Sequence, residues 1–228
     1  MFRFALPFLL VVPALCAKPP TSYWIWTGIT PEPYMQGAPL YIFQGTLSEE
    51  KGVLKHTREG LSPHALAHEI HLVYRATHPI PDAKNILAVF HTQRLGWEKH
   101  GVRVKGIQID ADVPTRRLKD YAKDLARLRA RLGKTYALSV TGLGDWTGAP
   151  YRRDFLALTR AVDEMVIQLY QARTMHKEHA RFTRALCASG APFKLGLLAK
   201  VDANTYLEET RQKCPGFQGV ALFVQKEG

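Results

Sequence analysis

The stretch GIQIDADVP, residues 106–114, carries two carboxylates two positions apart at the end of an apolar run. Side chains alternate along a β-strand, so Gln108, Asp110 and Asp112 share one face and the isoleucines take the other. Two carboxylates this close in a partly dry pocket cannot both ionise cheaply, so the pKa of one should be raised. A carboxylic acid of that kind can serve as a general acid near neutral pH.

An ordinary structural role would also account for these acids. Asp112 would then end the strand and cap the turn before Pro114, while Asp110 would pair with a nearby Arg or Lys. The triplet as a whole favours chemistry, because Gln108 and Asp110 interrupt an apolar run where polar side chains are costly unless they are used or paired. We therefore expect Asp112 to be the general acid/base and Asp110 to tune it.

Polar and aromatic side chains also end several other apolar runs, among them SYWIWTG, HLVYRA, SVTGLGDW and IQLYQ. Tryptophan and tyrosine at such places suit stacking on sugar rings, whose apolar faces need aromatic platforms. Each aromatic residue taken alone is more typical of a hydrophobic core than of a binding site. The candidate substrate-binding residues are Gln108, Gln168, Tyr170, Trp26, Trp146, Asp145 and Arg75.

The densest group of histidines, in PHALAHEIH, raises the question of a metal site. His64 and His68 would be helical neighbours, but His71 falls in a predicted strand and no HExxH signature occurs. The sequence also has no GxSxG elbow and no glycine-rich phosphate loop. We therefore expect no metal ion and no cofactor.

The chain from residue 85 onward alternates between helical and strand patterns. Helices are predicted over 85–101, over 115–133 with Thr115 as N-cap, over about 153–162, and in HKEHARFTRALCASG and ANTYLEETRQKC. The strands between them are VKGIQID, TYALSV, EMVIQLY, FKLGLLA and GVALFVQ. These runs are apolar on both faces, as parallel strands covered by helices should be.

Three further strand candidates, SYWIWTG, PLYIFQG and IHLVYRA, precede these five. Eight parallel strands predict an α/β fold, a closed and minimal (β/α)₈ barrel of the TIM type. Its first half should have reduced helices, because the polar segment between Gly45 and Ile70 has room for a hairpin or loop. A doubly wound open sheet is the alternative. In a barrel, Asp112 would lie at the C-terminal rim, where barrel enzymes build their sites.

The N-terminus has the pattern of a secretory signal peptide. Arg3 is followed by an apolar run that is too short to span a bilayer and by small residues up to Ala17. We expect cleavage after Ala17, so that residues 1–17 are the signal peptide and 18–228 form one barrel domain. A lipid anchor on Cys16 is a less suitable alternative, because Leu15 fits poorly before an acceptor cysteine. The mature protein should be periplasmic or secreted, with no transmembrane helix.

Export affects how the two remaining cysteines and the net charge are interpreted. Cys187 and Cys214 would form a disulfide in an oxidising compartment, and two buried free thiols are the alternative. The formal net charge of +11 favours anionic surfaces such as acidic polysaccharide, although solubility alone would also explain it. Much of the excess lies in TRRLKDYAKDLARLRARLGK, whose basic residues would form the solvated face of a helix. We expect a monomer that binds a glycan, with acidic glycans among the candidates, and no nucleic acid.

The order of segments resembles a bacterial family of exported proteins that is known only as a domain of unknown function. The segments that carry this resemblance are YWIWTG, VYRATHP, VKGIQIDADVPTRRLKDYAKDL, LSVTGLGDW, VDEMVIQLYQ and APFKLGLLAK. The resemblance covers nearly the whole mature chain. It implies a (β/α)₈ barrel of the glycoside hydrolase kind.

A more distant resemblance is to family-18 chitinases, whose fourth strand reads D-G-x-D-x-D-x-E and whose sixth ends in M-x-Y-D. The resemblance places Gln108 and Asp110 on two of the aspartates and Asp112 on the acidic glutamate. Tyr170 falls on the tyrosine, and Gln171 replaces the following aspartate. A shorter acid sits farther from the glycosidic oxygen, and losing two carboxylates weakens substrate-assisted hydrolysis. We therefore expect either a glycoside hydrolase-like protein that acts on a glycan by general acid/base catalysis, or a non-catalytic glycan-binding or envelope-associated barrel.

Overall fold

The computed structural model describes residues 21–66, 68–77 and 79–225. The predicted signal peptide, residues 1–17, lies outside the described residues. Within the described ranges, no helix combines the length and the apolar composition that crossing a membrane requires.

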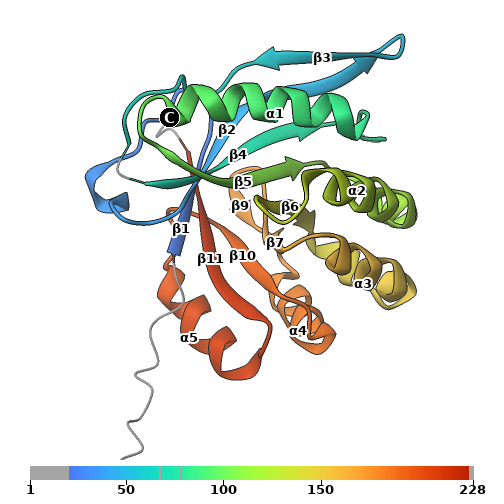
Figure 1. The fold of residues 1–228 in the computed structure, drawn as a ribbon. Helices are drawn as coiled ribbons and strands as arrows, with labels where there is room; N and C mark the ends of the chain where they lie inside the picture. Colours follow the sequence, from blue (N-terminus) through green and yellow to red (C-terminus); the bar gives the residue numbers. More distant parts are fainter. Residues whose placement is uncertain (1–20, 67, 78, 226–228) are drawn as a thin grey trace, which may run out of the picture.

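Parallel strands form a closed barrel at the centre of the molecule (Figure 1). Neighbouring strands follow the order of the chain, and β1 pairs with both β11 and β2, which closes the sheet. The predicted (β/α)₈ barrel is therefore confirmed, and the open doubly wound sheet is wrong. The barrel strands are β1 (Thr21–Ile25), β2 (Leu40–Glu50), β4 (Glu69–Ala76), β5 (Arg103–Asp110), β6 (Ala137–Leu143), β7 (Glu164–Gln168), β10 (Phe193–Leu198) and β11 (Phe217–Val224).

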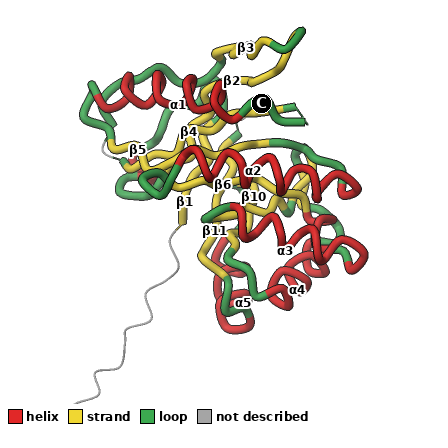
Figure 2. Tube along the Cα trace, turned by 45° about the vertical axis from the view of Figure 1, so that its right-hand side comes forward, coloured by secondary structure: helices red, strands yellow, loops and turns green. Residues whose placement is uncertain are grey.

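Helices cover the outside of the barrel on the side of its later strands (Figure 2). The α-helices are α1 (Ala83–Glu98), α2 (Leu118–Leu132), α3 (Arg152–Ala161), α4 (His179–Ser189) and α5 (Ala203–Lys213). Each follows one of the strands β4, β5, β6, β7 and β10. After β1 the described chain forms only the 3₁₀ turn η1 (Pro33–Met35), and after β2 it forms the antiparallel strand β3 (Val53–Arg58). The first half thus has reduced helices, as predicted.

Short elements complete the connections. The 3₁₀ turns are η2 (Thr115–Arg117), η3 (Gly144–Thr147) and η4 (Ala149–Tyr151), and a small hairpin is formed by β8 (Tyr170–Gln171) and β9 (Thr174–Met175). Thr115 was expected to be the N-cap of α2. It instead begins η2, and α2 starts at Leu118 without a side-chain cap.

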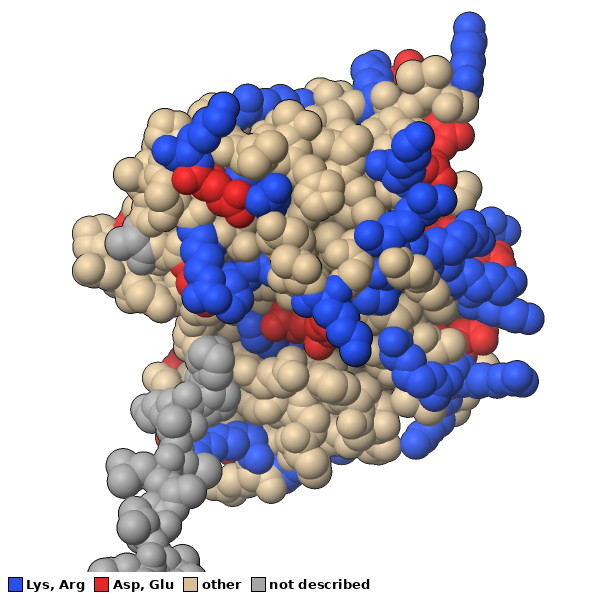
Figure 3. Space-filling view, in the orientation of Figure 1, with Lys and Arg blue, Asp and Glu red and all other residues tan. Residues whose placement is uncertain are grey.

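Local sequence explains the rest of α2. Its apolar residues recur at helical spacing and are buried against the barrel, and Gly133 ends the helix with a φ of 69° that favours glycine. The buried residues are Leu118, Tyr121, Ala122, Leu125, Leu128 and Leu132. The opposite face is basic and exposed, as predicted. Figure 3 shows Lys and Arg crowded over the side of the molecule where α2 and α3 lie.

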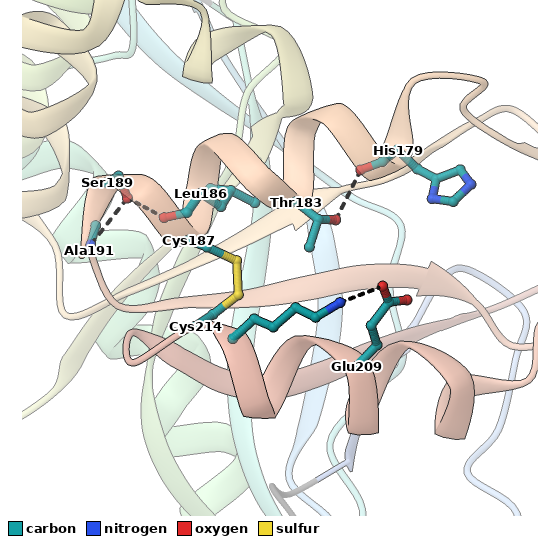
Figure 4. Close-up of a disulfide and its surroundings, with 9 residues drawn as sticks. His179, Thr183, Leu186, Cys187, Ser189, Ala191, Glu209 and Cys214 are labelled. Carbon is teal, nitrogen blue, oxygen red and sulfur yellow. Dashed lines mark hydrogen bonds and ion pairs between the residues drawn. A yellow bond between two sulfur atoms is a disulfide. The ribbon is translucent and has the colours of Figure 1, made fainter.

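A disulfide joins the last two helices. Cys187 lies in α4, Cys214 follows α5, and their Cα atoms are 4.6 Å apart (Figure 4). The predicted disulfide is therefore confirmed, and the free-thiol alternative is wrong. By restricting the unfolded chain, a crosslink of this span should stabilise the fold by about 3 kcal/mol.

The barrel has two cores of different character. The large core lies between strands and helices and is almost wholly apolar. The inner core, inside the barrel, has a much smaller apolar cluster made by Trp24, Tyr41, Val73, Val166 and Ala221. Polar side chains fill much of the remaining interior, which makes the inside of the barrel the place to look for function.

Candidate functional site

A pocket of about 630 Å³ opens at the C-terminal ends of the barrel strands. Its wall comes from β1, β4, β5, β6, β7 and β11 and from the turns that follow them. The lining residues are Trp24, Trp26, Arg75, Asp110, Asp112, Leu143, Gln168, Tyr170, Gln171, Ala172, Arg173, Phe223 and Gln225. Strands that are distant in sequence thus bring most of the predicted site residues to one place.

Asp110, the last residue of β5, is the buried acid of this pocket, with 3% of its surface exposed. Thr141 Oγ1 on the neighbouring strand donates a hydrogen bond of 2.5 Å to Asp110 Oδ1, and Arg75 Nε lies 3.7 Å from Oδ2. Burial raises the pKa of Asp110, and Asp112 raises it further. Thr141 and Arg75 lower it, but not enough to cancel the burial.

Asp112 lies two residues beyond the end of β5 and is exposed at the rim of the same pocket. The residues on either side of it, Ala111 and Val113, are buried. Val113 is held from both directions, because its amide donates to Ala111 O at 2.8 Å and its carbonyl accepts from Trp146 Nε1 at 2.8 Å. This anchored backbone presents the Asp112 carboxyl to the pocket from a rigid support.

Arg75 connects the buried acid to an aromatic wall. Its guanidinium carbon lies 5.2 Å from the ring centroid of Trp26, and the Trp26 ring stacks on Phe43 at 3.8 Å. The Arg75 side chain is 52% exposed. The ion pair with Asp110 is therefore long and open to solvent, and it neutralises the acid only in part.

Tyr170 and Gln168 enter the pocket from the end of β7. The Tyr170 ring stacks on Phe223 of β11 with centroids 5.5 Å apart and planes 9° from parallel. The pKa of Tyr170 is raised, chiefly by burial and further by Asp110 and Asp112. Tyr170 thus stays a neutral hydrogen-bond donor next to both acids.

Two predicted substrate-binding residues do not reach the pocket. Trp146 is fully buried, packs edge-to-face on Tyr121 of α2, and uses its indole N–H to hold Val113. Its expected role as a stacking platform is wrong, because β6 ends in the turn η3, which directs the ring outward between barrel and helices. Asp145 is exposed in that turn and is not among the residues that line the pocket.

Gln108 lies deeper than predicted. Only 1% of its surface is exposed, and it lines a second, smaller cavity beneath the pocket. Trp24, Gln168, Tyr170 and Phe223 line both cavities, so the small one forms the floor of the site.

Sequence reasoning missed other residues of the site. Phe223 and Gln225 lie two positions apart on β11 and its end, and the alternation within GVALFVQ would have placed both inside the barrel. Arg173 lies in the turn of a short hairpin, and nothing in its local sequence marks it.

The three histidines considered as metal ligands have separate roles. His64 Nδ1 contacts Ser62 O, His68 Nδ1 contacts Ala38 O, and the His71 ring stacks on Tyr41 inside the barrel. In the part of the chain that the structure describes, no three His, Cys, Asp or Glu residues are placed to hold a metal ion together.

Comparison with known proteins agrees with this architecture. Residues 74–179 match the family described as a domain of unknown function, DUF3142. No curated protein matches the chain.

Several solved structures share the fold over about nine-tenths of the chain. The xylanase and α-amylase inhibitor protein XAIP-II from Scadoxus multiflorus is 14% identical with a TM-score of 0.58, covering 90% of this chain and 92% of that one. Concanavalin B is 15% identical with a TM-score of 0.54, covering 90% and 93%. A GH18 chitinase from Pseudoalteromonas aurantia is 11% identical with a TM-score of 0.54, covering 90% and 94%. At such identities the likeness shows the fold alone, which is a TIM-like (β/α)₈ barrel.

Proposed function

We propose that this protein is an exported glycoside hydrolase-like protein that acts on a polysaccharide or other glycan by general acid/base catalysis. The observation that carries the proposal is the pairing of a buried acid, Asp110, with an exposed acid, Asp112, in one pocket at the C-terminal mouth of the barrel. Tyr170 lines the same pocket. A pocket of about 630 Å³ has room for a sugar unit with its neighbours extending into solvent.

The two acids would have different tasks. Asp112 is accessible, so it can give a proton to a glycosidic oxygen and take one back from water. Asp110 is almost wholly buried, and burial raises its pKa, so it holds a proton more readily than an exposed aspartate does. The protonation state of Asp110 would thereby determine whether a negative charge lies beneath the bound sugar.

The remaining side chains would hold the substrate. Tyr170 and Gln168 offer a hydroxyl and an amide toward the sugar, and the stacked rings of Tyr170 and Phe223 provide an apolar surface. Trp26 has Phe43 stacked against it and Arg75 lying over its ring. It would therefore contact a sugar with the exposed part of its ring.

Export is part of the proposal. The disulfide between Cys187 and Cys214 is typical of an oxidising compartment, and residues 1–17 are predicted to be the signal peptide. Protein expressed with its own N-terminus should be found outside the cytoplasm with Lys18 as its first residue. The basic surface over α2 and α3 would suit an acidic glycan or envelope.

Hydrolysis of a panel of bacterial and plant glycans by the purified mature protein tests the reaction. Asp112→Asn should reduce the rate at least about 100-fold, while Asp145→Asn should leave it unchanged, since Asp145 is an exposed acid outside the pocket. Hydrolysis that survives Asp112→Asn would remove Asp112 from its role.

A second function is a non-catalytic glycan-binding barrel. It is favoured by the aspartate at position 112, whose carboxyl is one methylene shorter than a glutamate's, and by the names of some structural neighbours, which describe inhibitors and not hydrolases. Binding of a glycan with no release of product, equally strong in Asp112→Asn, would favour this alternative.

A further inference from the structure

A chain of hydrogen bonds runs through the lower half of the barrel interior. Lys194 Nζ donates to Glu164 Oε2 at 2.7 Å and to Tyr41 Oη at 2.8 Å, and Tyr41 Oη in turn donates to Glu164 Oε1. Ser139 Oγ donates to the same Oε1 at 3.2 Å, and Gln108 Nε2 lies 2.9 Å from Ser139 Oγ. The chain therefore links a buried ion pair to the floor of the site.

The ionisation state of Glu164 determines which groups donate and which accept along this series of hydrogen bonds. Burial alone would raise the pKa of Glu164, but Lys194, His71 and the hydrogen bonds it accepts outweigh burial and lower it. Glu164 is therefore ionised and can only accept. The single hydroxyl proton of Ser139 goes to this carboxylate, so Ser139 Oγ must accept from Gln108.

This order of donors and acceptors determines how the Gln108 amide is turned. Its NH₂ group faces Ser139, which leaves Oε1 as the acceptor on the other side of the amide. Gln108 Oε1 has no hydrogen-bond partner among the described residues. Trp24 Nε1, a donor, is likewise unpaired within the described chain, and only 7% of Trp24 is exposed.

Both side chains line the small cavity beneath the pocket. Its volume is about 10 Å³, room for roughly one water-sized group. A buried donor and a buried acceptor are costly to leave unpaired, and a single oxygen that both donates and accepts can satisfy the two. A hydroxyl has this property, whereas an ether or a carbonyl oxygen only accepts and a methyl group does neither.

We propose that this cavity binds one hydroxyl group of the glycan, which donates to Gln108 Oε1 and accepts from the Trp24 indole N–H. The inference deepens the proposed function, on which it rests for the identity of the ligand. The cavity shares Trp24, Gln168, Tyr170 and Phe223 with the pocket, so a sugar seated above can place one hydroxyl into it. Ser139 and Glu164 act as positioning residues, because they keep the Gln108 acceptor turned toward the hydroxyl.

Crystals soaked in isopropanol or in acetone test the site without any glycan. The two probes have the same shape, but only isopropanol can donate a hydrogen bond. We expect the isopropanol oxygen within hydrogen-bond distance of both Gln108 Oε1 and Trp24 Nε1, and acetone outside the cavity. Trp24→Phe, which retains an apolar ring but loses the donor, should abolish the ordered isopropanol. Ser139→Ala should turn the Gln108 amide and weaken the site in the same way.

Isopropanol absent from the cavity, or acetone bound there equally well, would overturn the proposal. If Trp24→Phe does not fold, the comparison of the two probes in the wild-type protein still decides. A glycan identified by the screen adds a second measurement, since its analogue lacking the buried hydroxyl should bind at least about 10-fold more weakly. Isopropanol bound as expected in a protein that binds no glycan would retain the hydroxyl site and reject the proposed function.

Discussion

Replacing Lys194 by Met would leave the Glu164 carboxylate buried without its cation. The two charged groups are 2.7 Å apart, and their side chains are only 9% and 15% exposed. Their attraction amounts to roughly 6 kcal/mol at an effective dielectric constant of about 20, before the cost of desolvation. Removing one partner of such a pair typically costs about 3–5 kcal/mol. Because Tyr41 and Ser139 still donate to Glu164, we expect the free energy of unfolding at pH 7 to fall by about 3 kcal/mol.

The loss should depend on pH in a particular direction. The folded-state pKa of Glu164 lies below its ordinary value of 4.5, so its contribution to stability is complete above that value and is lost as the pH falls through the folded-state pKa. His71 does not replace Lys194 as the cation near neutral pH, because burial lowers the pKa of His71 to about 4. In Lys194→Met, Glu164 will protonate at higher pH. The difference in stability from the wild type should therefore shrink between pH 7 and pH 4.

Urea unfolding of both proteins across this pH range measures the effect, and Lys200→Met is the matched control. Lys200 follows the same strand, is exposed, and forms no ion pair within the described residues, so its loss should change stability by less than about 0.5 kcal/mol. Adding Glu164→Leu to Lys194→Met should recover part of the loss, because the uncompensated charge is gone. A cost below about 1 kcal/mol at pH 7, unchanged by pH, would refute the ion pair as an energetic element.

Three further predictions concern individual residues. Asp110→Asn should raise the free energy of unfolding more at pH 8 than at pH 4. The folded-state pKa of Asp110 is raised, so its carboxyl favours the fold while it is protonated and ceases to do so once the pH rises above that pKa. Thermal unfolding of both proteins at the two pH values measures this difference. Replacing both Cys187 and Cys214 by Ser should lower the free energy of unfolding by about 3 kcal/mol, and a reducing agent should destabilise the wild type but not this variant. Trp146→Phe, which loses the bond to Val113, should lower the free energy of unfolding by about 1–3 kcal/mol, as measured by urea unfolding.

The barrel and the location of its mouth could be predicted from the sequence because parallel strands leave a strong pattern. Apolar runs alternating with helices gave the strand order, and period-two alternation placed Gln108 and Asp110 inside the barrel. The same alternation places Phe223 inside the barrel, although an aromatic residue in an apolar strand is usually core. In this barrel the same side chain is both core and pocket wall.

Residues beyond the strand ends could not be placed in this way. Trp146 and Asp145 follow β6 in a 3₁₀ turn. The direction of their side chains depends on how that turn packs on the surrounding helices and not on any local period. The ion pair between Lys194 and Glu164 was missed for another reason. Each lies near the start of its strand, where a charged residue is usually an exposed strand end. The two strands pair directly, but only closure of the barrel encloses both side chains and brings Tyr41 of β2 into contact with them.

The state of Asp110 bears on which of the two proposed functions is the better one. A pocket that only binds glycan can use a fully ionised carboxylate as an acceptor for sugar hydroxyls, but it has no need of a carboxyl whose ionisation is opposed by burial. Arg75 is available to pair with Asp110, but it lies 3.7 Å away, half-exposed and over the ring of Trp26. The pKa of Asp110 accordingly remains raised. Burying a carboxyl that is only partly neutralised, next to an accessible second acid, costs folding free energy. Acid/base catalysis needs such an arrangement and simple binding does not, which favours the hydrolase proposal.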